Sequence, residues 1–272
     1  MSDPLERIAA AIEKLVPGEA RGADWAIAPA YVWTGAAARP VDRIEAPALD
    51  QLKGIDRQKE AVAGNVARLA SGAAAHDMLL WGARGMGKSA LVRAATVAAQ
   101  AGGAARLALV QVAADALPSL PALFGELRGE PRNFLVYLDD LGFAEGDTVG
   151  PRHLRSWLEG GVEARPANVR LAVTSNRRAI VPRHLGEQDD PVNPRDALDD
   201  LQALADRFGL SVGFHSASQD DYLAIVAAYA GPLNLAWEQA DALEWAKRRG
   251  ARSGRTAWQY VTELAGRAGR PV

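Results

Sequence analysis

The spacing of apolar residues changes along this chain. Between residues 78 and 214, short apolar runs of strand length alternate with segments whose apolar residues recur every three or four positions. A chain in which strands alternate with helices is expected to form a parallel, doubly wound α/β sheet with helices on both faces. Five strands are predicted, over residues 78–81, 106–112, 133–138, 169–174 and 210–214.

The segments between these strands have the spacing of amphipathic helices. Glycine pairs end two of them, at 102–103 and 160–161. The polar stretch 183–200 contains prolines and predicts an insertion in this αβα core. The predicted helices cover residues 55–71, 88–101, 119–128, 151–160 and 197–207.

Strand-like runs stop after residue 216, and only helical spacing remains. Ser218 can cap the first of the later helices, with Asp221 at the capping-box position. This pattern predicts a small all-helical lid over residues 217–272. Its helices are expected over residues 219–230, 236–249 and 255–267. Its core is expected to contain Trp237, Trp245 and Trp258.

The first fifty residues follow neither pattern throughout. Residues 4–16 have helical spacing, which a Pro-Gly pair ends. Residues 17–50 are rich in proline, glycine and alanine and predict an irregular arm, which Trp25 and Trp33 would anchor to a partner or to the same chain. The predicted units are 1–50 (N-terminal helix and arm), 51–216 (αβα core) and 217–272 (lid).

Composition narrows the class of protein. With 31 basic and 33 acidic residues, the net charge is −2, which argues against a globally basic nucleic-acid-binding protein. The absence of cysteine excludes disulfides, a thiolate nucleophile and cysteine-bearing zinc sites. No apolar run approaches the length of a membrane span, and the N-terminus lacks the pattern of a signal peptide. We therefore expect a cytoplasmic protein with no membrane partner.

One glycine-rich segment carries the clearest chemistry. Gly82-Ala83-Arg84-Gly85-Met86-Gly87-Lys88-Ser89 matches G-x-x-x-x-G-K-[ST], the P-loop motif. The glycines let backbone N–H groups approach phosphate oxygens, Lys88 can reach the β- and γ-phosphates, and Ser89 can bind Mg²⁺. The segment lies between a predicted strand and a predicted helix, which argues against a chance glycine turn. Together with Ala90, these residues predict a site for ATP and Mg²⁺.

Two acidic residues follow the third predicted strand. A carboxylate at the carboxyl end of a strand beside the P-loop strand can hold Mg²⁺, and Asp139 fits that role together with Ser89. Asp140 would then orient or deprotonate the attacking water. Many ATPases of this type have glutamate there, so the shorter aspartate predicts slow hydrolysis or an adjusted geometry. Taken alone, two acids at this place are more often a solvated strand end.

The fourth predicted strand ends in Ser175-Asn176. The Asn176 amide can hold the lytic water or touch the γ-phosphate, but serine and asparagine are also common in turns, and both explanations stay open. A basic cluster follows, which could contact nucleic acid or a neighbour's nucleotide; a solvated loop is the simpler explanation. The cluster consists of Arg177, Arg178, Arg183 and His184.

The order of P-loop, acidic pair, Asn176 and helical lid resembles that of the AAA+ ATPases. Residues 52–59 look like the segment that packs around adenine in that superfamily, and residues 206–209 look like the end of the helix that carries its arginine finger. Gly254-Arg255 resembles the sensor-2 position. Within the superfamily the chain looks closest to a bacterial family of predicted ATP-binding proteins of unknown function. The stretches that carry this likeness are residues 79–89, 174–178, 206–210 and 253–255.

The resemblance implies roles for further residues. Ile55 would contact the nucleotide, Arg207 would reach the γ-phosphate of a neighbouring subunit, and Arg255 would sense the nucleotide from the lid. A finger that acts in trans implies a homo-oligomer, either a ring or a helix. Each arginine could instead form a surface ion pair. Other candidates for the finger or sensor are Arg183, Arg195 and Arg252.

These features predict a Mg²⁺-dependent ATPase of AAA+ type that binds ATP and ADP and acts as an oligomeric switch or remodeller. Its target, a protein or a nucleic acid, is not encoded in a recognisable motif. One alternative is a nucleotide-gated loader or adaptor with little hydrolysis of its own. A small-molecule kinase is a second alternative, which the helical lid and Arg207 disfavour.

Overall fold

The computed structural model describes residues 23–103, 106–142, 154, 158, 165–176 and 207–271. The helix predicted at 4–16 and the insertion at 183–200 lie outside these ranges, as do most of the helices predicted at 151–160 and 197–207. The basic residues Arg177, Arg178, Arg183, His184 and Arg195 also lie outside them. None of the helices in the described ranges is long and apolar enough to cross a membrane.

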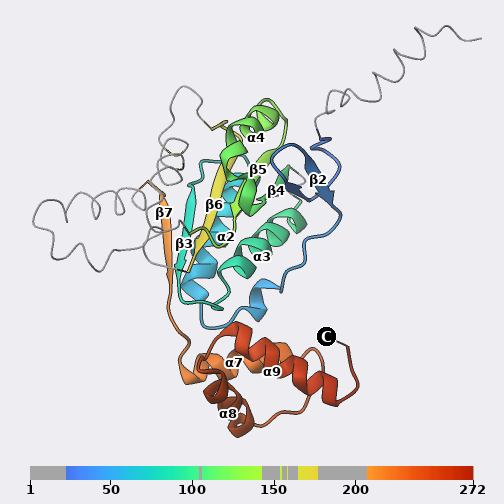
Figure 1. Ribbon diagram of the computed structural model, residues 1–272, viewed down its shortest axis with the longest axis vertical. Helices are drawn as coiled ribbons and strands as arrows, with labels where there is room; N and C mark the ends of the chain where they lie inside the picture. The colour runs from blue at the N-terminus through green and yellow to red at the C-terminus, as the bar shows by residue number, and fades with distance from the viewer. Residues whose placement is uncertain are drawn as a thin grey trace, which may run out of the picture.

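A seven-stranded sheet forms the centre of the molecule (Figure 1). The strands lie in the order β2-β1-β4-β5-β6-β3-β7, and all neighbouring pairs are parallel except β1 with β2. The five predicted strands are confirmed. They are β3 (Met78–Gly82), β4 (Leu107–Val112), β5 (Asn133–Leu138), β6 (Val169–Ser175) and β7 (Leu210–Phe214).

The two additional strands correct the prediction of an irregular arm. β1 (Ala30–Trp33) pairs with β4, and β2 (Ala38–Val41) pairs with β1 at the edge of the sheet. Both strands are only four residues long, which gives a weak strand pattern in the sequence. Pro40 in β2 also argues against a strand, because proline is tolerated in a sheet mainly at an edge, where β2 lies. The predicted division into arm, core and lid stays a prediction, but the arm contributes two strands to the sheet of the core.

Buried aromatic side chains attach this N-terminal segment to its own chain. Trp25, Tyr31 and Trp33 are each at most 3% exposed. The Trp33 indole donates a hydrogen bond to Ser119 Oγ (2.7 Å), and Arg132 donates to the carbonyl of Trp25 (2.5 Å). Burying these large rings favours the attached arrangement by the hydrophobic effect, so the anchor expected from the sequence is intramolecular.

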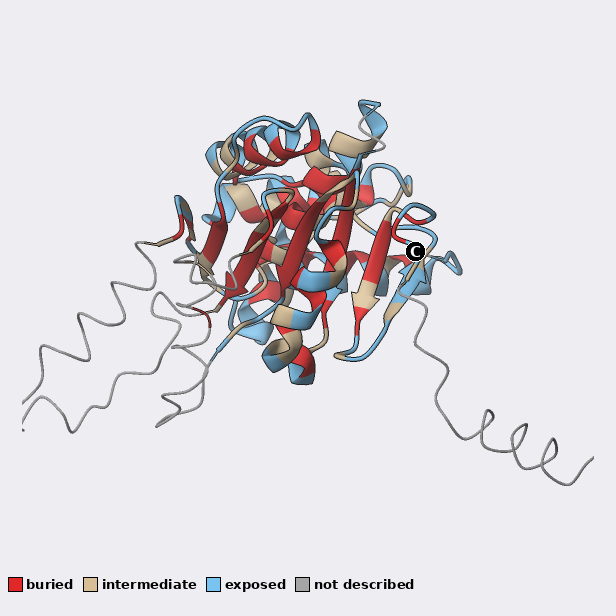
Figure 2. Ribbon diagram, turned by 90° about the horizontal axis from the view of Figure 1, so that it is seen from above, coloured by how far each residue is buried: buried red, intermediate tan, exposed pale blue. Residues whose placement is uncertain are grey.

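Helices cover both faces of the sheet. α2 (Asp56–Ala70) and α3 (Lys88–Ala101) pack on one face, where they share a core with Leu80 of β3. α4 (Leu120–Leu127) packs on the other face with Leu79. Neighbouring strand residues point to opposite faces, and because both faces are covered the central strands are buried almost throughout (Figure 2).

The chain after β7 forms the predicted helical lid, with α7 (Gln219–Ala230), α8 (Gln239–Arg249) and α9 (Gly254–Arg267). The capping box at its start is confirmed, since the N–H of Asp221 donates to Ser218 Oγ (3.0 Å) and the Asp221 carboxylate accepts from the Ser218 N–H (3.3 Å). In Figure 1 the lid lies below the sheet, at the end where β7 leads into α7.

Candidate functional site

The P-loop has a backbone that requires glycine. Gly82, Gly85 and Gly87 have φ values of 115°, 76° and 87°, in the left-handed region that residues with a Cβ rarely adopt. A Cβ on Gly82 would lie 2.1 Å from the carbonyl oxygen of Phe214. The next residue, Ala83, donates its N–H to that same carbonyl (2.8 Å), so β7 holds the start of the loop in place.

Lys88 lies inside the loop, and its side chain is almost fully buried. Its ammonium group donates hydrogen bonds to the carbonyls of Gly82 (2.9 Å) and Ala83 (2.8 Å) and to Oδ1 of Asn176 (3.0 Å). Burial lowers the pKa of Lys88, and the carboxylates of Asp140 and Asp139 oppose that shift. The three hydrogen bonds use all the donors of the ammonium, so a bound anion would replace some of these partners.

One carboxylate oxygen of Asp139 accepts hydrogen bonds from two hydroxyl groups. Ser89 Oγ donates to Asp139 Oδ1 over 2.7 Å, and Thr174 Oγ1 donates to the same atom over 2.8 Å. Burial alone would raise the pKa of Asp139, but the nearby hydroxyl of Tyr137 and the hydrogen bonds from Ser89 and Thr174 outweigh it and lower the pKa. The ionised carboxylate therefore lies beside the Ser89 hydroxyl.

Asp140 has φ of 51°, a left-handed conformation that is uncommon outside glycine. Aspartate and asparagine adopt it more readily than most other residues, which gives a structural reason for aspartate where many such ATPases have glutamate. The N–H of Asp140 donates to Thr174 Oγ1 (2.8 Å), and its carboxylate accepts from the Asn176 amide. An Arg84 nitrogen lies 4.0 Å from Asp140 Oδ2.

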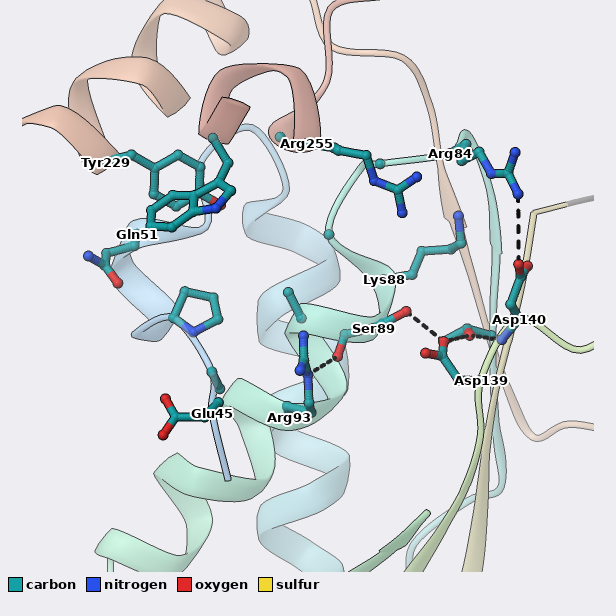
Figure 3. Close-up of a pocket in the computed structure, with 18 of the residues that line it drawn as sticks. Glu45, Gln51, Arg84, Lys88, Ser89, Arg93, Asp139, Asp140, Tyr229 and Arg255 are labelled. Carbon is teal, nitrogen blue, oxygen red and sulfur yellow. Dashed lines mark hydrogen bonds and ion pairs between the residues drawn. The ribbon is translucent and has the colours of Figure 1, made fainter. Parts of the chain in front are cut away.

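These groups open into one cavity of about 810 Å³ between the P-loop, the strand ends and the lid. Figure 3 shows Arg84, Lys88, Asp139 and Asp140 at one end and Tyr229 of α7 at the other. The volume lies within the range of about 300–1,000 Å³ typical of small-molecule sites. The predicted site residues that line it are Arg84, Gly85, Gly87, Lys88, Ser89, Ala90, Asp139, Asp140, Asn176 and Arg255.

The lid supplies an aromatic wall to the cavity. Trp258 of α9 packs edge-on against Tyr229 of α7, with ring centroids 5.3 Å apart. Trp258 is 43% exposed, so the prediction that it belongs to the lid core is wrong. Trp237 and Trp245 do pack against that core. Trp258 differs because it lies three residues after Arg255 on α9, on a face that opens toward the cavity.

Some predicted site residues lie away from the cavity. Ile55 is buried beneath the loop, where its Cδ1 would lie 3.7 Å from a Cβ on Gly87, and it is not among the described residues that line the cavity. Arg207 lies three residues before β7 begins, and Leu210 of β7 pairs with Met78, at the amino end of β3. Arg207 is therefore near the edge of the sheet opposite the P-loop. Gly82, Ala83 and Met86 belong to the P-loop but are not among the described residues that line the cavity.

The structure also brings residues to the site that the sequence did not single out. Thr174 bonds to both acidic residues, although in the sequence it was noted only as the first residue of the stretch 174–178 that carries the family likeness. Arg93 lies one turn after Ser89 on α3 and reaches back toward the Ser89 carbonyl. The remaining ones are Glu45, Ala46, Pro47, Gln51, Tyr229, Pro232, Leu233 and Trp258.

The donor set fits Mg²⁺. Ser89 and Asp139 offer two hard oxygen ligands that already lie 2.7 Å apart. Mg²⁺ typically binds proteins through one or two such groups and takes its other ligands from phosphates and water. No group of three histidine, cysteine, aspartate or glutamate side chains suited to a metal occurs among the described residues. The site therefore suits a metal ion that takes some of its ligands from a bound phosphate.

Comparison with solved structures identifies the fold. The RuvB Holliday junction branch migration motor of Thermotoga maritima superposes with a TM-score of 0.54 at 15% identity, covering 82% of this chain and 66% of that one. The Orc1 protein of Aeropyrum pernix, solved in complex with DNA, gives 0.54 at 16% identity, covering 81% and 65%. The chain thus spans slightly less than two thirds of those structures. At this identity the likeness shows the fold alone, an AAA+ ATPase fold of the RuvB type.

Comparison by sequence places the chain in a family. No curated protein matches it. One family model, described as a protein of unknown function (DUF815), matches residues 26–268 and so includes β1 and β2 as well as the lid. Since that match spans most of the sequence, the chain belongs to the DUF815 family.

Proposed function

We propose that this protein binds ATP with Mg²⁺ and hydrolyses it. The observation that carries the proposal is the convergence of Lys88, Ser89 and Asp139 on one cavity, with Asp140 and Asn176 beside them. A lysine, a hydroxyl and a carboxylate in a glycine loop are the groups that P-loop enzymes use to hold a nucleotide phosphate and its metal. The AAA+ fold supports the same conclusion.

The cavity has surfaces for each part of the nucleotide. Phosphates would lie over the P-loop and the N-terminus of α3, where backbone N–H groups and the helix dipole favour anions. Lys88 would exchange its carbonyl partners for phosphate oxygens. The Tyr229–Trp258 pair at the other end offers an aromatic surface for the base.

Hydrolysis would be an in-line attack of water on the γ-phosphorus. The bond from that phosphorus to the bridging oxygen breaks, and its electron pair leaves with ADP. Asp140 accepts the proton of the water, and Asn176 fixes the position of the Asp140 carboxylate. Bound Mg²⁺, held by Ser89 and Asp139, would supply positive charge to the phosphates.

An oligomer is part of the proposal. Arg207 lies near the amino edge of the sheet and far from its own P-loop, a placement that suits a residue acting on a neighbour's nucleotide. Arg255 lines its own cavity, which suits a sensor in cis. The RuvB structure is described as a branch migration motor, and the Orc1 structure contains DNA. Nucleic acid is therefore one candidate target, and a protein is the other.

A second function, a nucleotide-gated loader or adaptor with little turnover, is favoured by one observation. Asn176 donates to Oδ1 of the Asp140 carboxylate and Arg84 faces Oδ2, so an attacking water would have to compete with these contacts. A protein of this kind would bind ATP tightly and hydrolyse it only when a partner displaces those contacts.

Nucleotide binding and phosphate release separate these functions. Calorimetry with ATP and ADP in the presence of Mg²⁺ should show binding to the wild type and none to Lys88→Ala. Asp140→Asn should bind ATP but release little phosphate. Wild-type protein that binds ATP but shows no turnover, alone or with DNA, would favour the loader. Wild-type protein that binds neither nucleotide would refute the proposed function.

A further inference from the structure

We propose that Arg84, inside the P-loop, is a catalytic residue that acts in cis on the terminal phosphate of the nucleotide bound by its own chain. The inference rests on the proposed ATPase function and adds a residue to it. The fixed positions of the P-loop motif do not specify this side chain, because Arg84 occupies a variable position.

The geometry places the Arg84 guanidinium at the reacting end of the cavity. Arg84 lines the cavity with Lys88 and Arg255, and all three side chains extend into the same region (Figure 3). One guanidinium nitrogen lies 4.0 Å from Oδ2 of Asp140, the carboxylate assigned to the attacking water. A cation beside that carboxylate is also beside the phosphate that the water attacks.

The backbone on both sides of Arg84 is held in place. The N–H of Ala83 donates to the carbonyl of Phe214 (2.8 Å), and the carbonyl of Gly85 accepts from the N–H of Arg255 (3.2 Å). A Cβ on Gly85 would lie 2.9 Å from Ser253 Oγ, so the loop and the lid touch closely here. The backbone at Arg84 is therefore held in place, and its side chain projects from this fixed position toward the reacting end of the cavity.

The side chain itself is free to change partner. It is 72% exposed, and an exposed ion pair at 4.0 Å contributes little to stability. The guanidinium groups of Arg84 and Arg255 and the ammonium of Lys88 line the same part of the cavity, so three positive charges lie close together there (Figure 3). An anion with several charges placed among them removes that repulsion, and a γ-phosphate is such an anion.

This arrangement gives Arg84 two successive partners. Without nucleotide it faces Asp140; with nucleotide, its guanidinium moves to the γ-phosphate oxygens, which it can contact with two parallel N–H groups. The exchange leaves Asp140 free to accept the proton of the water. Arg84 forms and breaks no covalent bond in the reaction.

The first test compares ATP with ADP, because only ATP has the γ-phosphate. We would measure both dissociation constants by calorimetry in Mg²⁺ for the wild type, Arg84→Ala and Arg84→Lys. Arg84→Ala should lose ATP affinity by about tenfold or more relative to ADP and should lower turnover by about 10²-fold. Arg84→Lys should recover part of both. An unchanged ratio of ATP to ADP affinity would overturn the inference.

A matched control is available in the lid. Arg248 on α8 is 71% exposed and forms an i,i+4 pair with Glu244, away from the cavity. Arg248→Ala should keep the wild-type affinities and turnover. A loss of ATP affinity and turnover seen only in Arg84→Ala would therefore come from the position of Arg84 at the cavity and not from removing an exposed arginine. A wild type that binds neither nucleotide refutes the proposed function itself. A wild type that binds both, with the ratio unchanged in Arg84→Ala, refutes only the role of Arg84.

The second test separates action in cis from action in trans. An Arg84→Ala variant mixed with Lys88→Ala should show no more turnover than the two variants measured separately. If Arg84 acts in cis, each substitution disables the nucleotide site of its own chain, so a mixed oligomer contains no intact site. A rise on mixing would place Arg84 in a neighbour's site and overturn the inference. The mixture of Arg207→Ala with Lys88→Ala is the comparison. If Arg207 is a finger that acts in trans, a Lys88→Ala subunit can supply it to the intact P-loop of an Arg207→Ala subunit, so part of the turnover should return.

Discussion

The side chains of Lys88 and Asn176 meet at 3.0 Å, although 88 positions separate them in the sequence. The same Asn176 amide donates to the carboxylate of Asp140. One amide thus joins the lysine that would hold the phosphates to the acid that would activate water. The strand order brings β6 next to β3 and creates this contact.

Replacing Asn176 with alanine should slow hydrolysis more than it weakens binding. The variant loses the group that fixes the Asp140 carboxylate, and loss of one positioned polar group in an active site lowers turnover by about 10²-fold. Phosphate release and ATP calorimetry, measured together, check this. Gln111→Ala, exposed on β4, is the control and should behave as wild type. Full turnover in Asn176→Ala would reduce Asn176 to a turn residue.

Replacing Thr174 with valine should weaken both stability and Mg²⁺ dependence. Its hydroxyl donates to Asp139 and accepts from the partly buried N–H of Asp140, which valine leaves without this partner. We expect a loss of about 1–3 kcal/mol in the free energy of unfolding and a higher Mg²⁺ concentration for half-maximal turnover. Thr96→Val removes a buried hydroxyl within α3 and should affect stability alone. If both variants keep the wild-type Mg²⁺ dependence, Thr174 does not position the metal ligand.

Replacing Trp258 with alanine should weaken binding of the base and spare binding of the phosphates. The ring is partly exposed and forms the wall of the cavity with Tyr229. An aromatic platform for a base contributes about 1–3 kcal/mol, so ATP affinity should fall while the affinity for inorganic tripolyphosphate stays constant. Competition binding with both ligands measures this. An equal loss for both ligands would mean that Trp258 supports the lid and does not contact the base.

Two glycine-to-alanine substitutions should have opposite effects on stability. Gly82→Ala places a methyl group against the Phe214 carbonyl on a backbone with φ of 115°, and should destabilise the fold by roughly 1–3 kcal/mol. Gly64→Ala, within α2, meets nothing within 4 Å and should stabilise by about 0.5–1 kcal/mol. Chemical denaturation of the two variants measures both. Equal stability of Gly82→Ala and wild type would show that the loop can move away from β7.

Acid should destabilise the protein partly through Asp139. Its pKa is lowered in the folded state from an ordinary value of 3.8, because the nearby Tyr137 hydroxyl and the hydrogen bonds from Ser89 and Thr174 outweigh burial. A lowered folded pKa means that the carboxylate stabilises the fold above the unfolded pKa, and that this contribution is lost as pH falls below 3.8. Asp139→Asn should flatten the part of the stability curve that lies below pH 3.8. An unchanged stability curve in Asp139→Asn would mean that ionisation of Asp139 does not contribute to the stability of the fold.

The sequence alone determined those parts of this protein that depend on local chemistry. The five core strands, the P-loop and the lid helices follow from periodicity and from residues adjacent in the chain, because backbone conformation is largely a local property. The capping box of Ser218 and Asp221 is of the same kind, since both residues lie within one helical turn.

The tertiary structure decided what depends on neighbours distant in the chain. β1 forms because it pairs with β4 and because the rings of Trp25 and Trp33 are buried in the hydrophobic core. Thr174 became part of the site because strand order brought β6 beside β5 and β3, and Trp258 became part of the cavity because the lid turns that face of α9 toward it. A strand pairing or a helix docking depends on surfaces that meet only in the folded chain, so no local pattern could specify them.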